Sequence, residues 1–131
     1  GKGSALGTTP IISMDENLKT TFGGGAVGAT NTANATGSTT LNFDTYQNHV
    51  LTATGNITLA NPSTESVGQT GFIAIIQDGT GSRTLTLGTD YESPASGGIT
   101  LTTTASATDI VPYVVVAANR VALGTPQLAF G

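Results

Sequence analysis

This 131-residue sequence contains no cysteine, no tryptophan and few charged residues. Charged side chains make up 9% of the chain, against roughly 25% in an ordinary soluble domain. Without cysteine, a disulfide framework and a thiolate metal site are both excluded. No apolar run approaches the roughly 20 residues that a membrane-spanning helix needs.

Positive charge is especially scarce. The net charge is −4, and Lys2, Lys19, Arg83 and Arg120 are the only lysines and arginines. A nucleic-acid-binding protein needs a positive stripe that releases counterions from phosphates. A helix that lies on a membrane surface needs a basic face as well. We therefore expect neither nucleic acid nor a membrane as a partner.

Threonine, serine, asparagine and glycine take the place of the missing charge, and threonine alone is about a fifth of the chain. Threonine is β-branched, which suits a pleated strand, and its hydroxyl suits the wet side of a sheet. Soluble monomers usually keep charge on their surface. A polar but nearly neutral surface favours a protein that works inside an assembly. The alternative is a small extracellular module.

From Thr39 onward the sequence has the alternation of β-strands. Leu41 and Phe43 alternate with polar residues, as do Ile57 and Leu59. Residues 110–118 are apolar on both faces and predict a central strand, with a bulge or an edge near Pro112. Turn signals recur every 8 to 12 residues. We therefore predict an all-β fold, an antiparallel, jelly-roll-like β-sandwich, for residues 39–131.

Residues 71–88 predict a hairpin, because two apolar runs flank a loop rich in glycine and polar residues. Within the loop, Asp78 bonds the turn backbone, and Gly79 and Gly81 supply positive φ angles. Arg83 is expected to pair with Asp78. An EF-hand calcium loop is excluded because its twelfth position, counted from Asp78, is a threonine.

Residues 1–38 predict an extended N-terminal arm. The stretch 23–38 reads GGGAVGATNTANATGS, which offers too little apolar area to offset the entropy of ordering. We expect this arm to become ordered only against a partner. Its candidate partner-binding anchors are the apolar residues Ile11, Ile12, Leu18 and Phe22.

The remaining motifs fail as chemical sites. Glycines at 23, 25 and 28 match G-x-G-x-x-G, but no helix follows them. Asp90 and Glu92 are best explained as a solvated loop edge, with a weak surface cation site as the alternative. His49 is the only histidine, and no G-x-S-x-G accompanies it. We expect no catalytic residues, no cofactor and no metal, hence no enzyme.

One region resembles a known module. Its pieces are GNITL at 55–59, NP at 61–62, GQTG at 68–71, QDGTGSRT at 77–84 and LTTTASATDI at 101–110. This order resembles a β-sandwich module of tailed-bacteriophage virion proteins, found in capsid decoration (cement) proteins and in tail-fibre or tail-associated proteins. The resemblance covers about half the chain and implies no catalytic residues.

The resemblance leads to two hypotheses. In the first, the chain is a capsid decoration protein on the outer capsid surface of the virion. It binds and stabilises the major capsid protein lattice, as a homotrimer. In the alternative, the chain is a tail-fibre or tail-associated module that recognises a host cell-surface glycan through the loops 78–82 and 93–98.

Overall fold

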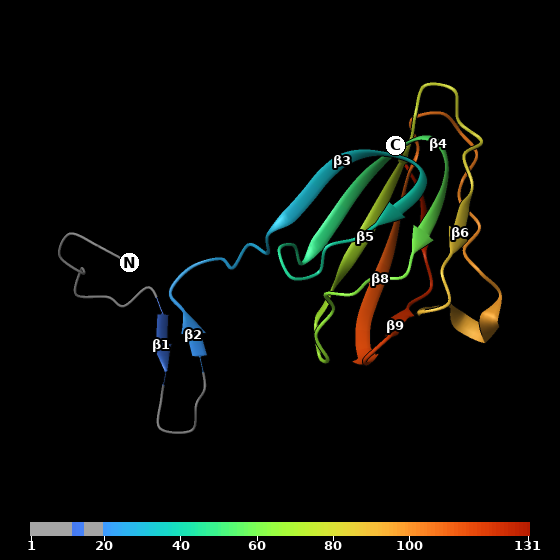
Figure 1. Ribbon diagram of the computed structural model, residues 1–131. Helices are drawn as coiled ribbons and strands as arrows, with labels where there is room; N and C mark the ends of the chain where they lie inside the picture. Colours follow the sequence, from blue (N-terminus) through green and yellow to red (C-terminus); the bar gives the residue numbers. More distant parts are fainter. Residues whose placement is uncertain (1–11, 15–19) are drawn as a thin grey trace.

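The computed structural model describes residues 12–14 and 20–131, and it is built almost entirely of strands (Figure 1). A single 3-10 turn, η1 (Pro94–Ser96), is the one helical element of the described part. Nothing in that part is a helix long and apolar enough to cross a membrane. The strands are β1 (Ile12–Met14), β2 (Thr20–Phe22), β3 (Thr30–Thr40), β4 (Asn48–Ala60), β5 (Thr70–Gln77), β6 (Leu85–Leu87), β7 (Tyr91–Glu92), β8 (Thr108–Ala117), β9 (Arg120–Leu123) and β10 (Gln127–Phe130).

These strands form two sheets. β1 and β2 make a two-stranded antiparallel sheet of their own. The other eight strands form one curled sheet in the order β3-β4-β5-β8-β9-β7 (Figure 1). β6 adds to β4, and β10 adds to β8. The predicted all-β class is therefore confirmed, and the strands of the body form one curled sheet.

The sheet is mixed rather than antiparallel, which corrects the prediction. β3 runs parallel to β4, β4 runs parallel to both β5 and β6, and β7 runs parallel to β9. The sequence pattern could not show this, because alternation marks which residues face the core and not the direction of a neighbouring strand. Parallel neighbours also need a return connection, and this chain makes its returns without helices.

A shared bend makes those short returns feasible. A straight β3 would be about 33 Å long, whereas the seven residues between β3 and β4 reach at most about 28 Å. The register of β3 against β4 shifts between Ala35 and Gly37, and Gly37 has a φ of 61°. Figure 1 shows both strands strongly curved. The bend brings the end of β3 back within reach of the start of β4.

The predicted hairpin at residues 71–88 is also wrong. β5 pairs with the first half of β4, from His49 to Ala53, and β6 pairs with the second half, from Ile57 to Leu59. Both pairings are parallel, so the chain continues along the same edge of β4. Residues 78–84 therefore form a loop that leaves the edge of β4 at the bend and returns to it. The loop does not reverse the chain direction as a hairpin would.

The core lies inside the curl. Odd-numbered residues of β4 face it on both sides of the bend, so Leu51, Ile57 and Leu59 are all buried. The return segment contributes Leu41 and Phe43, which are buried as well. The alternation predicted for Leu41 with Phe43 and for Ile57 with Leu59 therefore marks the core face correctly.

β8 is a central strand, as predicted, but Pro112 marks no bulge there and β8 is not an edge strand. On one edge, β8 pairs without a register shift with β5, and Pro112 lies opposite Phe72. On the other edge, β10 pairs up to Ile110 and β9 pairs from Tyr113. On this edge Pro112 therefore faces the gap between the end of the β10 pairing and the start of the β9 pairing. A residue without an N–H group costs least there.

His49 is fully buried beneath aromatic rings. The ring centroids of Phe43 and Tyr46 lie 5.3 Å and 6.2 Å from its own, in edge-on geometry. Neither ring nitrogen has a hydrogen-bond partner among the described residues. Burial lowers the pKa of His49 from 6.5 to about 4, because a charged imidazolium would lose its hydration there.

We predict that acid destabilises the fold through His49. The unfolded chain takes up a proton below pH 6.5 and the folded chain only near pH 4, so stability falls as the pH drops between these values. The loss is about 2 kcal/mol by pH 5. Urea unfolding at pH 7 and pH 5 measures it. His49→Leu should remove most of this difference, and an unchanged difference in that variant would rule out His49 as its source.

We predict that Gly55→Ala destabilises the bend of β4. A Cβ at Gly55 would lie 2.3 Å from the Thr36 hydroxyl on β3. The clash is with a side chain rather than with backbone, so Thr36→Ala should restore much of the lost stability in the double variant. Thermal unfolding of the two single variants and the double variant checks this, and strictly additive losses would contradict it.

Candidate binding pocket and the loop beside it

One pocket of the described part begins at β6. Its volume is about 630 Å³. It is formed by β6, β7, η1 and the loops that join them. The lining residues are Leu85, Thr86, Leu87, Gly88, Thr89, Tyr91, Glu92, Ser93, Ala95, Ser96 and Gly98. All of them come from one continuous stretch, which we call the 85–98 pocket.

Hydroxyl groups dominate the polar chemistry of this pocket. Threonine and serine side chains line it, and each hydroxyl can both donate and accept a hydrogen bond. Leu85 and Leu87 add apolar surface. Tyr91 supplies the one aromatic ring among the lining residues, and it is only 5% exposed. The pocket therefore suits a small neutral polar ligand better than a flat aromatic one.

The carboxylate of Glu92 supplies the charge of the 85–98 pocket, and Arg120 holds it in place. The Arg120 guanidinium on β9 donates to both carboxylate oxygens of Glu92, from Nε at 2.6 Å and from Nη2 at 2.9 Å. This contact lowers the pKa of Glu92. Glu92 is therefore charged at neutral pH and fixed in direction, because the bidentate contact restrains it.

Asn61 fixes the turn that enters the pocket. Its side-chain amide donates to the Thr89 hydroxyl at 2.8 Å, and its oxygen accepts from the Asp90 N–H at 3.1 Å. Gly88 packs so closely here that an added Cβ would lie 2.3 Å from the same oxygen. One side chain after β4 thus positions the wall between β6 and β7.

The far wall of the pocket has unusual backbone geometry. Ala95 and Ser96 have φ angles of 52° and 55°, and Gly98 has 73°. Non-glycine residues in this region carry conformational strain, which often marks functional loops. The Ser93 hydroxyl accepts from the Gly98 N–H at 2.8 Å and closes the loop on itself.

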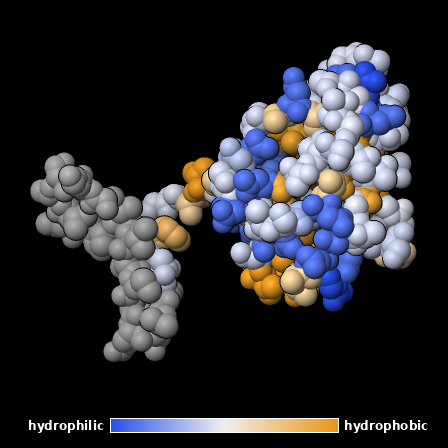
Figure 2. Space-filling view, in the orientation of Figure 1, coloured by the Kyte–Doolittle hydropathy of each residue, from blue (hydrophilic) through white to orange (hydrophobic). Residues whose placement is uncertain are grey.

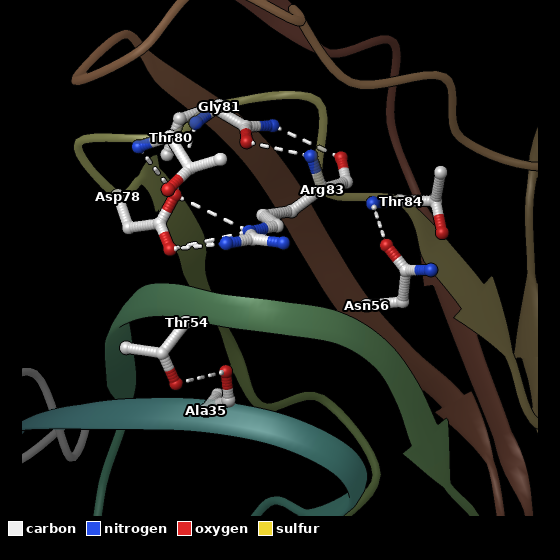
Figure 3. A network of polar contacts seen from close by, with 9 residues as sticks. Ala35, Thr54, Asn56, Asp78, Thr80, Gly81, Arg83 and Thr84 are labelled. Atoms are coloured by element: carbon white, nitrogen blue, oxygen red, sulfur yellow. Dashed lines mark hydrogen bonds and ion pairs between the residues drawn. The ribbon is translucent and has the colours of Figure 1, made fainter.

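The excursion at 78–84 is held by its own polar network (Figure 3). One carboxylate oxygen of Asp78 accepts from the N–H groups of Thr80 and Gly81, at 3.0 and 2.9 Å. The Arg83 guanidinium donates to Asp78, with its shortest contact at 2.7 Å. The hydrogen bond from Arg83 is the main reason why the pKa of Asp78 is lowered. These contacts hold the loop in one shape.

Gln77 joins the two ends of this loop. Its buried side chain imitates a strand neighbour, because its oxygen accepts from the Arg83 N–H at 2.9 Å and its nitrogen donates to the Arg83 carbonyl at 3.0 Å. The same nitrogen donates to the Thr102 carbonyl at 2.7 Å. Gln77 therefore replaces, with one amide, the ladder bonds that the chain gives up between β5 and β6.

The predicted turn residues differ in their backbone. Gly81 has a φ of 75°, and an added Cβ would lie 2.5 Å from the Thr103 carbonyl. Gly79 is not among the residues with positive φ, and an added Cβ there would meet nothing within 4 Å. Of this pair, Gly81 is the position where glycine is required.

The predicted arm anchors are only partly described. Ile11 and Leu18 lie outside the described residues, and Ile12 belongs to β1. Phe22 ends β2 and is 53% exposed. Phe22 is not among the residues that line the 85–98 pocket.

The two loops proposed as one recognition surface lie apart. The excursion 78–84 precedes β6, whereas residues 93–98 follow β7. Figure 1 places them at opposite ends of this side of the body. Residues 93–98 line the 85–98 pocket and residues 78–82 do not. Of the two, the second loop is the one that belongs to a pocket.

Sequence reasoning missed Gln77, Asn61 and Asp109. Buried Asp109 accepts from the Thr102 N–H at 2.6 Å and from the Ala129 N–H at 2.9 Å, so it ties β10 and the preceding loop to β8. A polar residue at an inward position of an apolar strand was the available signal, since buried polar groups need partners.

No group of three or more histidine, cysteine, aspartate or glutamate side chains comes together to hold a metal within residues 12–14 and 20–131. Asp90 and Glu92 make separate contacts: Glu92 pairs with Arg120, and the Thr89 hydroxyl donates to Asp90 at 3.4 Å. The two carboxylates therefore have different partners.

Comparison with known proteins supplies the family. Residues 39–117 match the family described as "Putative phage tail fibre C-terminal domain". The chain belongs to this family. Neither the curated proteins nor the solved structures that were compared give a match. The protein is therefore a phage structural protein associated with the virion.

The family favours the tail-fibre hypothesis over the capsid decoration hypothesis. It also covers β4 to β8 of the tail-fibre domain completely, together with the whole 85–98 pocket. The predicted position on the outer capsid surface is not supported by this match. The coarser prediction, a phage virion module, is confirmed.

We predict that Gln77→Leu destabilises the tail-fibre domain by at least about 2 kcal/mol. The variant keeps a similar volume but leaves the partly buried backbone groups of Arg83 and the Thr102 carbonyl without their partner. Urea unfolding measures the loss. The control is Gln127→Leu on exposed β10, which should change stability by no more than about 0.5 kcal/mol. Equal effects at both positions would contradict this role.

Proposed function

We propose that this tail-fibre domain is a host-contacting module that binds a cell-surface glycan in the 85–98 pocket. The observation that carries the proposal is a hydroxyl-lined pocket of about 630 Å³ inside the segment that defines a tail-fibre family. A sugar presents hydroxyl groups, which threonine and serine side chains can match by donating and accepting.

The pocket also has the mixed character that small-ligand sites need. Apolar side chains from β6 contact the ring carbons of a saccharide, while the fixed carboxylate of Glu92 accepts from its hydroxyls. Because Glu92 is paired with Arg120, its charge is already balanced. A neutral glycan is therefore favoured over a cationic one.

We propose a binding role without catalysis. His49, the only histidine, is fully buried in the core and away from the 85–98 pocket. The carboxylate of Glu92 is committed to Arg120, which disfavours its use as a general acid. The proposal includes no cofactor.

We also propose that the domain acts as a self-associated fibre tip, and a homotrimer remains the expected state. Few charged side chains and a nearly neutral surface support contacts between copies, because little charge must be desolvated. Binding to a major capsid protein remains a prediction from sequence that no observation here favours. Nucleic acid and membrane remain unexpected partners, since only four basic residues are available.

The test is adsorption of the purified domain to host cells and to a glycan array. We predict that Thr86→Trp, which fills the 85–98 pocket from an exposed strand position, lowers binding at least tenfold. Loss of pocket volume is the physical reason.

Thr104→Trp is the matched control, because Thr104 is exposed and does not line the pocket. It should bind like the unchanged domain. Equal binding by the Thr86→Trp variant, with unchanged thermal stability, would exclude this pocket as the glycan site. Failure of the unchanged domain to bind any glycan or host cell would overturn the host-contacting role itself.

A further inference from the structure

The outer face of the curled sheet is apolar, although it points away from the core. Nine apolar residues at even-numbered positions of β4, β5, β8 and β9 form it, and neighbouring strands are held in register there. We call it the outer face. Its residues are Val50, Phe72, Ala74, Ile76, Ile110, Pro112, Val114, Val116 and Ala122. The other even-numbered residues of these strand segments are polar: Thr52, Thr70 and Thr108 lie beside the apolar set, and Arg120 at the start of β9 is charged and paired with Glu92.

The outer face is open at β8. Val114 and Val116 are 37% and 44% exposed. A shallow groove of about 260 Å³ lies between β8 and β9, lined by Pro112, Val114 and their neighbours. Figure 2 shows an apolar patch at the end of the body where β8 turns into β9. A strand that is apolar on both faces is usually covered on both faces. We therefore expect another chain segment or protein to cover the outer face at β8.

The size of the outer face limits what covers it. Four strands and four alternating positions measure about 14 by 20 Å, or about 300 Å². A stable interface between two globular bodies needs about 800 Å² on each side. A second body resting only on this face would therefore be held too weakly, whereas one extended chain segment is of the right size.

The chain itself has such a segment. Residues 20–29, TTFGGGAVGA, contain no charged side chain. Phe22 is 53% exposed and Val27 is 95% exposed. Apolar atoms stand out on this segment in Figure 2 as well. Fully extended, its ten residues are about 33 Å long, enough to cross the outer face.

Within one copy this segment does not cover the outer face, because Val27 is 95% exposed, and its end is held at the start of β3. The Ala29 carbonyl accepts from the N–H groups of Gln47 and Asn48, at 2.8 and 3.0 Å. Gly28 packs against the same two residues, because an added Cβ would lie 2.6 Å from the Gln47 side chain. These contacts fix the direction in which the segment leaves the edge of the sheet.

We propose that residues 20–29 of one copy lie on the outer face of a second copy, with Val27 and Phe22 as the buried contacts. A neutral segment then meets the nine apolar residues of this face, and the nearby charge of Arg120 stays paired with Glu92. Each copy both gives a segment and receives one. This inference rests on the self-association proposed above and not on glycan binding.

The absence of cysteine makes cross-linking a direct test. A tagged Val27→Cys chain is mixed with an untagged Val114→Cys chain, and the mixture is oxidised. We predict a disulfide-linked species of one tagged and one untagged chain. The control mixture pairs tagged Val27→Cys with untagged Thr103→Cys. Thr103 is exposed on the loop before β8, near the end of β5 at Gln77, and this mixture should give at least tenfold less of the linked species.

The outcomes distinguish the proposed self-association from the proposed contact of residues 20–29 with the outer face. Sedimentation of the unchanged chain measures self-association, and a monomer at all concentrations would overturn both. An oligomer with no cross-link above the control, or a Val27→Cys/Val114→Cys double variant that links only within one chain, would overturn the segment contact alone.

A second variant tests the contact without cross-linking. Val114→Asp should weaken self-association at least tenfold, because it places a charge under the neutral segment, whereas Thr103→Asp should not change it. Both positions are exposed, so thermal unfolding should be little affected. Unchanged association of a folded Val114→Asp variant would overturn the proposal.

Discussion

The shared bend of β3 and β4 is the constraint on which the rest of the structure depends. Parallel strands need a return path, and a return of seven residues can reach the start of β4 only if β3 curves back. The bend is built where Gly37 takes a positive φ and where Gly55 leaves room for Thr36. It also draws the return segment inward, which gives the core Leu41 and Phe43.

The same bend explains the two loops beside the candidate site. The partner edge of β4 has to follow the turn, and the chain does so by leaving the ladder after Gln77 and rejoining it at β6. Gln77 replaces the lost ladder bonds, and the pair Asp78–Arg83 holds the excursion. β6 then begins the 85–98 pocket, so the pocket owes its position to a bend in a strand that does not line it.

The structure contains two different kinds of surface, which the amino-acid composition does not distinguish. The hydroxyl-lined 85–98 pocket is built from one continuous stretch of sequence and supports a role in recognition. The outer face is assembled from four strands that are far apart in the sequence and supports a role in assembly. The proposed function uses both, because a host-contacting module that self-associates has to join its neighbours and still present a binding site.

The sequence by itself determined the β class, the shared inward face of Ile57 and Leu59 and the central place of β8, because alternation and strand length are local properties. It also indicated the phage module. Only the tertiary structure decided that β3, β5 and β6 run parallel to β4, that residues 71–88 form no hairpin, and that the loops 78–82 and 93–98 lie apart. Those features depend on which edge of β4 each strand joins, and pairing between distant strands leaves no periodic mark on the sequence. The roles of Gln77, Asn61 and Asp109 were hidden for the same reason, since their partners come from other strands and loops.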